Sequence, residues 1–273
     1  MMALTNTTKT IFPEIDSERF KSIVRISGEE SIEEENEATD NDSAKTLQLL
    51  RVKGFPRLLP EGILALVDYC RYIRELSLSY SLLSDELLLA LSSEQQVQLE
   101  TLRLEAHSDT KPLPRLTENA WHTFSDRHQN INLVLLSYMS NEEDLNPLLM
   151  SHVPLTHLYF GEAPPETTLI RIARHCPRLV ELVLAAYGYA NLDKMLLAVA
   201  QGCPRLTAVA LGDCEITCSG LLEFVQYCAD RLKILYIWET ALNEETGLDI
   251  AEVSMRISHL LDRTWVPEYI PLW

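Results

Sequence analysis

The stretch Cys176-Pro-Arg-Leu-Val-Glu-Leu-Val-Leu184 decides the fold, because the spacing of its leucines recurs along most of the chain. Leu179, Leu182 and Leu184 follow the pattern apolar-x-x-apolar-x-apolar. The pattern occurs seven more times, with middle residues Leu50, Leu76, Leu102, Val134, Leu158, Val209 and Leu235. With Leu182 included, successive middle residues lie 26, 26, 32, 24, 24, 27 and 26 positions apart. Eight occurrences in near-constant register indicate an array of structural repeats.

This period and the L-x-x-L-x-L core are typical of leucine-rich repeats. In each short strand the last two apolar residues lie two positions apart, so they share one face and point into the interior. Apolar residues at helical spacing lie between the strands, for example Leu192, Met195, Leu196 and Val199. We therefore expect an α/β solenoid over residues 44–243, with about eight strand–helix repeats. A parallel sheet forms its concave side and the helices form its convex side. The 32-residue spacing indicates a loop insertion at residues 107–116.

The repeat pattern explains the positions of four cysteines better than a metal or catalytic site does. Cys70, Cys176 and Cys203 precede the first apolar strand position by three residues, and Cys228 precedes it by four. They are a repeat apart and lack nearby histidines, so we expect packing at a turn and no metal site. The chain contains no phosphate-binding glycine loop and no G-x-S-x-G elbow. The sequence predicts no catalytic residue, no cofactor and no enzyme activity.

The two ends of the chain differ from the repeats. Residues 1–43 contain eight acids and no base between Gly28 and Asp42, which predicts a largely disordered acidic segment. Residues 244–263 predict a capping helix, because Ile250, Val253, Ile257, Leu260 and Leu261 form one apolar stripe. Residues 264–273 form a proline-containing tail that ends in a tryptophan.

The formal charge of −17 disfavours binding to nucleic acid or to an anionic membrane and favours a basic protein partner. The sequence shows no secretory signal and no apolar run of membrane-spanning length. We therefore expect a monomeric protein of the nucleus and cytoplasm with free thiols.

The tail supplies the candidate binding residues. Prolines fix the backbone φ angle, so a proline-containing tail loses less entropy on binding than a flexible one does. Large aromatic side chains are typical anchors of protein interfaces. Two interpretations are open, because the tail could contact a partner or fold back to cap the last repeat. The candidate partner-binding residues are Trp265, Pro267, Tyr269, Pro271, Leu272 and Trp273.

Several segments resemble the F-box/leucine-rich-repeat proteins of the circadian clock that recognise cryptochromes. The resemblance lies in residues 80–94 (Tyr-Ser-Leu-Leu-Ser-Asp-Glu-Leu-Leu-Leu-Ala-Leu-Ser-Ser-Glu), Thr156-His-Leu-Tyr-Phe-Gly161, Cys176-Pro-Arg-Leu-Val-Glu-Leu182 and the tail pattern Trp265-x-Pro267-x-x-x-Pro271-x-Trp273. It implies a substrate receptor of an SCF-type (cullin-RING) ubiquitin ligase that binds cryptochrome. By this resemblance Trp273 occupies the flavin pocket of cryptochrome, and Trp265, Pro267 and Pro271 set the path of the tail.

The sequence departs from that family in one respect, because no F-box is visible in the first 43 residues. The ligase adaptor is therefore an expected partner only if a full-length form carries an F-box. Two alternatives remain open. The chain could protect cryptochrome without recruiting a ligase, or it could be a repeat scaffold for an unrelated basic protein.

Overall fold

The computed structural model describes residues 47–52, 59–109, 113–187, 189 and 191–267. They belong to one compact unit, Asp42–Trp273. The acidic segment predicted at residues 1–43 lies outside the described residues, as do Tyr269, Pro271, Leu272 and Trp273 of the tail.

The core of the fold is a parallel sheet in which eight strands pair in the order β1-β2-β3-β4-β5-β6-β7-β9. This confirms the predicted α/β leucine-rich-repeat solenoid. The eight strands are β1 Leu49–Arg51, β2 Glu75–Ser79, β3 Thr101–His107, β4 Asn132–Tyr138, β5 Leu155–Phe160, β6 Glu181–Ala185, β7 Ala208–Gly212 and β9 Ile234–Trp238. A second pair of parallel strands, β8 Glu215–Thr217 and β10 Ala241–Asn243, accompanies the last repeats.

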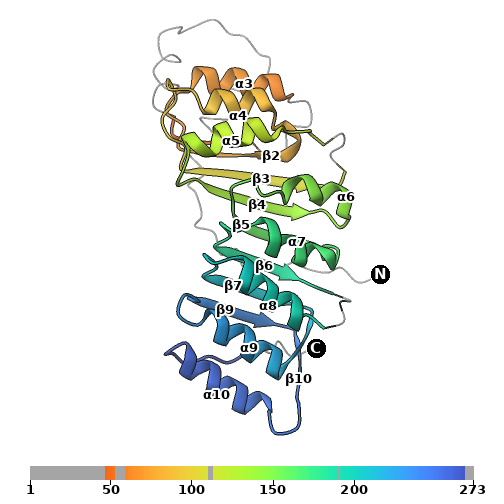
Figure 1. The fold of residues 1–273 in the computed structure, drawn as a ribbon. Coiled ribbons are helices and arrows are strands. Elements are labelled where there is room, and N and C mark those ends of the chain that lie inside the picture. The colour runs from red at the N-terminus through yellow and green to blue at the C-terminus, as the bar shows by residue number, and fades with distance from the viewer. Residues whose placement is uncertain (1–46, 53–58, 110–112, 188, 190, 268–273) are drawn as a thin grey trace, which may run out of the picture. The chain divides into compact units, whose positions relative to one another are not determined.

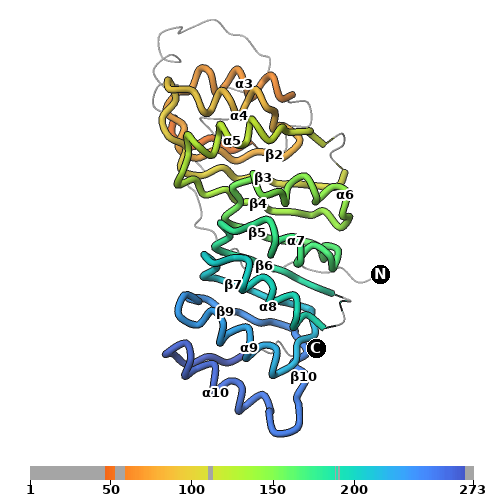
Figure 2. The backbone as a smooth tube through the Cα atoms, viewed as in Figure 1, coloured from red at the N-terminus to blue at the C-terminus, as the bar shows by residue number. Residues whose placement is uncertain are grey.

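Helices form a second layer on one face of this sheet (Figure 1). The α-helices are α3 Pro60–Tyr69, α4 Asp85–Leu91, α5 Glu118–Arg127, α6 Glu142–Leu145, α7 Thr167–His175, α8 Asp193–Gly202, α9 Cys218–Cys228 and α10 Ile250–Leu260. Short 3-10 turns occur at η1 Tyr80–Leu82 and η2 Asn146–Leu148. The backbone tube in Figure 2 shows each strand followed by a helical segment that returns the chain to the start of the next strand. Successive repeats therefore stack side by side.

The repeat pattern gives the core between the two layers. Leu102 and Leu104 of β3 and Leu182 and Leu184 of β6 are almost completely buried, as the two-residue spacing predicts. The stripe expected on α8 is also confirmed, because Leu192, Met195, Leu196 and Val199 are all buried. Burying a large aliphatic side chain contributes about 1.5–3 kcal/mol, so the summed burial between repeats is the main stabilising term of the solenoid.

The fourth strand corrects one part of the pattern. The spacing predicted that Val134 and Leu136 point inward, but Leu133 and Leu135 do so and pair with Leu102 and Leu104 of β3. Residues 133–136 are four consecutive apolar residues, so the sequence pattern does not distinguish the two faces here. The pairing with β5 also shifts register between Leu133 and Val134.

The capping helix is shorter than predicted. Helix α10 begins at Ile250 and ends at Leu260, whereas the apolar stripe predicted a helix over residues 244–263. Asp249 is its N-cap, with its side chain accepting a hydrogen bond from the Glu252 amide at 2.8 Å. Before it, Gly247 adopts a left-handed φ of 81° in a turn closed between Glu245 and Leu248. After it, Asp262 has a φ of 50°, which ends the helix.

The N-cap of α9 is not the residue that the sequence predicts. Ser219 precedes the apolar residues Leu221, Leu222 and Val225, so the sequence predicts an N-cap there. The cap is Thr217, whose hydroxyl accepts from the Gly220 amide at 2.9 Å. The same hydroxyl donates to Asp193 of α8 at 2.7 Å. A contact with the preceding repeat therefore selects the capping residue.

All six cysteines of the chain are free and buried. Burial raises the pKa of each thiol, to about 12 for Cys203 and about 11 for Cys214 and Cys228. We therefore expect none of the six thiols to react with Ellman's reagent in the native protein at pH 8. All six should react after unfolding in guanidinium chloride. Rapid reaction of any thiol in the native protein would contradict the packing described here.

Candidate partner-binding surface

The second face of the sheet carries none of the described helices, and we call it the open face (Figure 1). Side chains alternate across each strand, so every second residue points to this face. Paired strands align these residues in rows across the repeats. One row contains Arg51, Ser77, Arg103, Val134, His157, Glu181, Ala208 and Ile234. The next contains Ser79, Glu105, Leu136, Tyr159, Val183, Ala210 and Tyr236.

These rows divide the open face into a polar half and an apolar half. Strands β1 to β3 present mainly arginine, serine and glutamate. Strands β6, β7 and β9 present a set that we call the apolar platform, which consists of Val183, Ala185, Ala210, Ile234, Tyr236 and Trp238. Ile234 is 54% exposed and Tyr236 is 37% exposed, although both are large apolar residues. Exposed apolar side chains gathered in one place are typical of protein interaction sites.

Glycines allow aromatic rings to lie flat on this face. A Cβ atom added to Gly212 would lie 2.0–2.4 Å from ring atoms of Trp238, so the indole covers the position that a side chain would need. Gly161 has the same relation to Tyr138, at 2.3 Å from the ring. The ring of Tyr138 also stacks on His107, with centroids 4.6 Å apart. The rings of Trp238 and Tyr236 lie 5.7 Å apart and stack at 24°.

A charged group lies between the two halves. Tyr159 hydrogen-bonds to Glu181, and burial, the charge of Glu181 and this bond raise the pKa of Tyr159 to about 12 despite the opposing charge of Arg103. Burial lowers the pKa of His157, and Glu181 opposes that shift. Tyr159 and His157 are therefore neutral at pH 7, and the charges at the centre of the open face are those of Arg103 and Glu181.

The tail begins beside the last strand of the platform. Trp265 is 6% exposed, and its indole Nε1 donates to the Leu235 carbonyl of β9 at 2.9 Å. Its amide donates to the Ser258 hydroxyl at 2.9 Å, and that hydroxyl lies 2.7 Å from the Ser254 carbonyl and 3.1 Å from the Trp265 carbonyl, either of which can accept its proton. Trp265 therefore caps the last repeat, which was one of the two interpretations of the tail. It fixes where the tail starts, and it does not offer its ring as contact surface.

The other tail residues divide into two groups. Val266 is 64% exposed and Pro267 is half-buried, so the chain emerges from the core directly after Trp265. The predicted contact residues Tyr269, Pro271, Leu272 and Trp273 lie outside the described residues, and their role stays a prediction.

The open face is not among the predicted binding residues, although the sequence contains a signal for it. Tyr236 and Trp238 alternate with the buried Leu235 and Ile237, so the repeat pattern that locates the core also locates the outward positions. The aromatic character of these positions is the signal that could have identified the platform.

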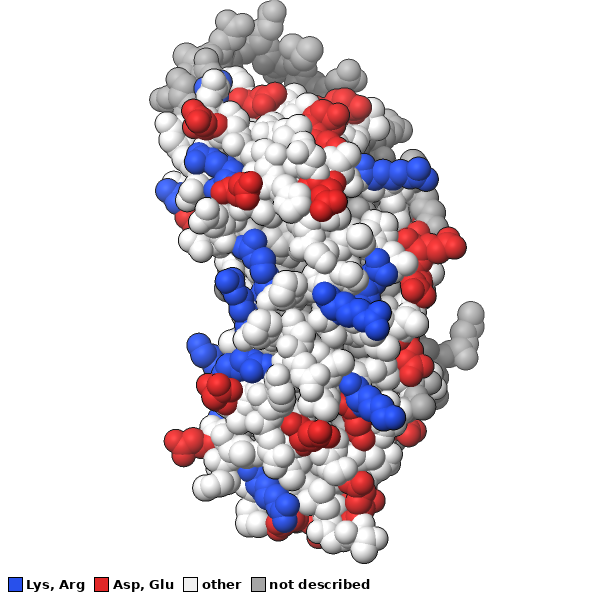
Figure 3. All heavy atoms as spheres, in the orientation of Figure 1, with Lys and Arg blue, Asp and Glu red and all other residues white. Residues whose placement is uncertain are grey.

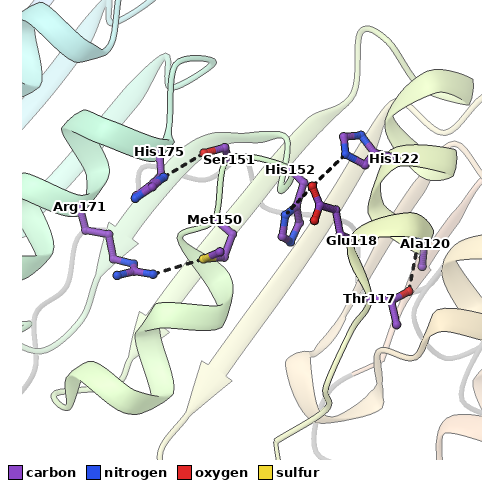
Figure 4. A network of polar contacts seen from close by, with 9 residues as sticks. All are labelled: Thr117, Glu118, Ala120, His122, Met150, Ser151, His152, Arg171 and His175. Carbon is purple, nitrogen blue, oxygen red and sulfur yellow. Dashed lines mark hydrogen bonds and ion pairs between the residues drawn. The ribbon is translucent and has the colours of Figure 1, made fainter.

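A polar cluster lies on the opposite, helix-bearing side (Figure 4). Glu118 contacts His122 one helical turn later at 3.3 Å and His152 of the following repeat at 3.8 Å. Nearby, the hydroxyl of Ser151 lies 2.9 Å from Nδ1 of His175. No three histidine, cysteine or acidic side chains in the described part of the chain could hold a metal ion. These contacts join neighbouring repeats.

Within the described residues, no helix is both long and apolar enough to cross a membrane.

Comparison with known proteins gives the chain a family context. It is 34% identical to F-box/LRR-repeat protein 21 of Mus musculus over 288 aligned residues, covering all of this chain and 66% of the mouse protein. The proteins of the same name from Ovis aries and Bos taurus are also 34% identical, with 85% of this chain and 54% of each relative covered. These similarities support the interpretation that the chain is a protein of the F-box/LRR family. The chain thus spans between about half and two thirds of their length.

Two further comparisons add little. No protein-family model matches the chain. A solved structure of a TLR13–ssRNA13 complex aligns with a TM-score of 0.41 and 14% identity, over 75% of this chain and 31% of that one.

The packing of Trp265 gives a prediction about stability. Trp265→Ala removes a buried indole and should lower the free energy of unfolding by about 3–5 kcal/mol. Trp265→Phe keeps most of the burial but removes the bond to Leu235, so the loss should be about 1 kcal/mol. Val266→Ala changes an exposed neighbour and is the control, with an effect within about 0.5 kcal/mol. Urea unfolding followed by circular dichroism measures all three. Equal effects of Trp265→Ala and Val266→Ala would show that Trp265 does not close the solenoid.

Proposed function

We propose that the chain is the substrate-recognition part of an SCF-type ubiquitin ligase and that its substrate is a cryptochrome. The observation that carries this proposal is the 34% identity to F-box/LRR-repeat protein 21, which extends over the whole repeat region. Ubiquitin-dependent control of cryptochrome stability is then the function, and the nucleus and cytoplasm are the compartments.

The geometry of the last repeats supports a binding role for the tail. The indole of Trp265 bonds to the carbonyl of Leu235, and Leu235 lies between Ile234 and Tyr236 of the apolar platform. The tail therefore starts from the strand that carries the most exposed apolar side chains of the open face. We infer that the platform and the tail contact the same partner, with the platform against its surface and Trp273 in a pocket.

The energetic contribution of the tail can be large. Fully burying a tryptophan side chain of about 200 Å² at about 25 cal/mol/Å² gives at most roughly 5 kcal/mol. The cost of ordering the tail reduces this value, but the anchor at Trp265 and the ring of Pro267 restrict its freedom before binding. Trp273 is therefore proposed as the main anchor, with Tyr269, Pro271 and Leu272 as its neighbours.

Two other functions fit part of the same observations. A chain that binds cryptochrome without engaging the ligase adaptor would protect cryptochrome from degradation. A repeat scaffold for an unrelated basic protein would fit the net charge of −17 and would use the tail only as a cap. The experiments below separate these three functions.

Deletion of Trp273 tests the role of the tail. Immobilised chain should capture cryptochrome, and the version that ends at Leu272 should lose most of this capture, because it lacks the proposed anchor. Trp273→Phe should retain part of it. Probing the same eluates for the ligase adaptor distinguishes a ligase receptor from a protective binder. Equal capture by the intact and shortened chains would exclude the tail as the binding element, and no capture by either would leave the unrelated-partner scaffold.

Substitutions on the open face test the platform separately from the tail. Ala210 lies in the same row as Val183 and Tyr236, so Ala210→Glu places a charge at the centre of the platform. We expect at least a tenfold weaker affinity for cryptochrome, since a buried unpaired charge is strongly unfavourable. Met255→Glu is the matched control, because Met255 is 60% exposed on the helix-bearing side. Calorimetric titration of both variants, with melting temperatures alongside, gives the comparison. Equal affinities would place the contact elsewhere.

A further inference from the structure

A row of basic side chains lies along the side of the solenoid where the helices end and the strands begin. Arg178, Arg205 and Arg231 immediately precede Leu179, Leu206 and Leu232, which are equivalent positions of three consecutive repeats. Backbone bonds join these repeats just after the arginines, from the Thr207 amide to the Val180 carbonyl at 2.8 Å and from the Lys233 amide to the Thr207 carbonyl at 2.7 Å. Paired strands lie about 4.8 Å apart, so the three arginines are neighbours. We call Arg178, Arg205, Arg231 and the exposed Lys233 the arginine edge.

The guanidinium groups of this edge have no acidic partner in the described residues. Arg178 donates to the Gln129 carbonyl at 2.6 Å and Arg231 donates to the Ala200 carbonyl at 2.6 Å, both in earlier repeats. Arg205 is exposed. Burial, together with the positive charge of Arg205, lowers the pKa of Arg178. Repulsion between these neighbouring positive charges is unfavourable, and a carboxylate bound beside them would offset it.

The distribution of the acids makes this edge unusual in so acidic a chain. At the opposite side, where helices begin, carboxylates bind backbone amides of the next or previous repeat. Asp85 accepts from Thr117, Asp193 from Thr217 and Glu245 from Ser219, at 2.9, 3.0 and 2.9 Å. Acids are favourable at helix N-termini and cations at helix C-termini, which separates the two charges. In Figure 3 lysine and arginine gather over the middle repeats, and acidic and basic groups alternate along the side where the helices end.

We propose that the arginine edge is a second binding site, which takes an extended acidic peptide segment of a partner protein. Two of its arginines are held by carbonyl bonds and are preorganised, and Arg205 between them keeps all its donors available. The backbones of Arg178 and Arg231 lie two strand spacings apart, about 10 Å, and the guanidinium group of Arg178 reaches further back, to the Gln129 carbonyl before β4. An extended segment with several acids along its length would therefore be needed to contact the whole edge. A nucleic acid fits less well, because its many charges would meet the net charge of −17.

This inference does not depend on the tail or on the open face, since neither contributes a residue to the edge. The alternative is that these arginines serve only as clamps between repeats. Arg205 distinguishes the two interpretations, because it makes no carbonyl bond of this kind within the described part of the chain, whereas Arg178 and Arg231 each make one.

Fluorescence anisotropy with the full chain and a short labelled peptide of glutamate and serine tests the proposal. The peptide should bind, and raising the salt from about 0.02 to 0.15 M should weaken it, because these charges are exposed to solvent. Arg205→Glu should lower the affinity about tenfold, as expected for a lost charge-assisted contact, and Arg205→Lys should lower it less. Circular dichroism should show both variants folded, since Arg205 is exposed.

Lys194→Glu is the matched control. Lys194 is exposed in the first turn of α8, whereas Arg205 follows the last turn of the same helix. The two substitutions change the net charge by the same amount, but only one of them lies on the arginine edge. The Lys194→Glu variant should bind the acidic peptide with nearly the affinity of the unchanged chain. Equal weakening by Lys194→Glu and Arg205→Glu would mean that bulk charge governs binding. No binding at low salt, or equal binding of a peptide of lysine and serine, would overturn the proposal.

Discussion

The burial of leucine pairs between adjacent repeats is the interaction on which the rest of this structure depends. A strand with Leu182 and Leu184 on one face cannot bury them alone, and both become fully buried because the strands and helices of neighbouring repeats close over them. The backbone ladder follows from this burial, since parallel strands in register satisfy the amides and carbonyls that the core removes from water. An array built in this way has two ends, and each end needs a cover.

The cover at the C-terminal end shows how stability and the candidate site are connected. Helix α10 buries Val253 and Ile257, and the indole of Trp265 fills the remaining space beside β9. Because Trp265 bonds to a backbone carbonyl of that strand, the residues after it start from a fixed point. The same tryptophan therefore closes the core and positions the tail. This dual role explains why an aromatic residue of a candidate binding segment can be buried in the unbound chain.

The leucine spacing alone predicted the class of fold, the number of repeats and most of the core. Where the prediction failed, the sequence was locally ambiguous or a tertiary contact decided. Residues 133–136 are apolar on both faces, so only the pairing with β3 selects Leu133 and Leu135 as the core pair. Asp193 of the preceding repeat selects Thr217 as the cap of α9. The tail was recognisable as a candidate site by its composition, but the burial of Trp265 depends on the geometry of α10 and β9. The alternation in β9 also indicates the apolar platform, but the prediction rested only on the buried positions of each strand.

The arrangement of charge follows from the direction of the helices. Each of the described helices between two strands runs from the end of one strand to the start of the next, so their N-termini lie on one side of the solenoid and their C-termini on the other. Unpaired amides at the first side attract carboxylates, and an unpaired carbonyl at the second can accept from an arginine, as the Ala200 carbonyl in the last turn of α8 does from Arg231. Repetition places arginines at equivalent positions on the second side, where Arg178, Arg205 and Arg231 precede three consecutive repeats. A cation that makes no carbonyl bond there, such as Arg205, keeps its donors for another molecule. A solenoid with a net charge of −17 can therefore still carry a local row of basic side chains.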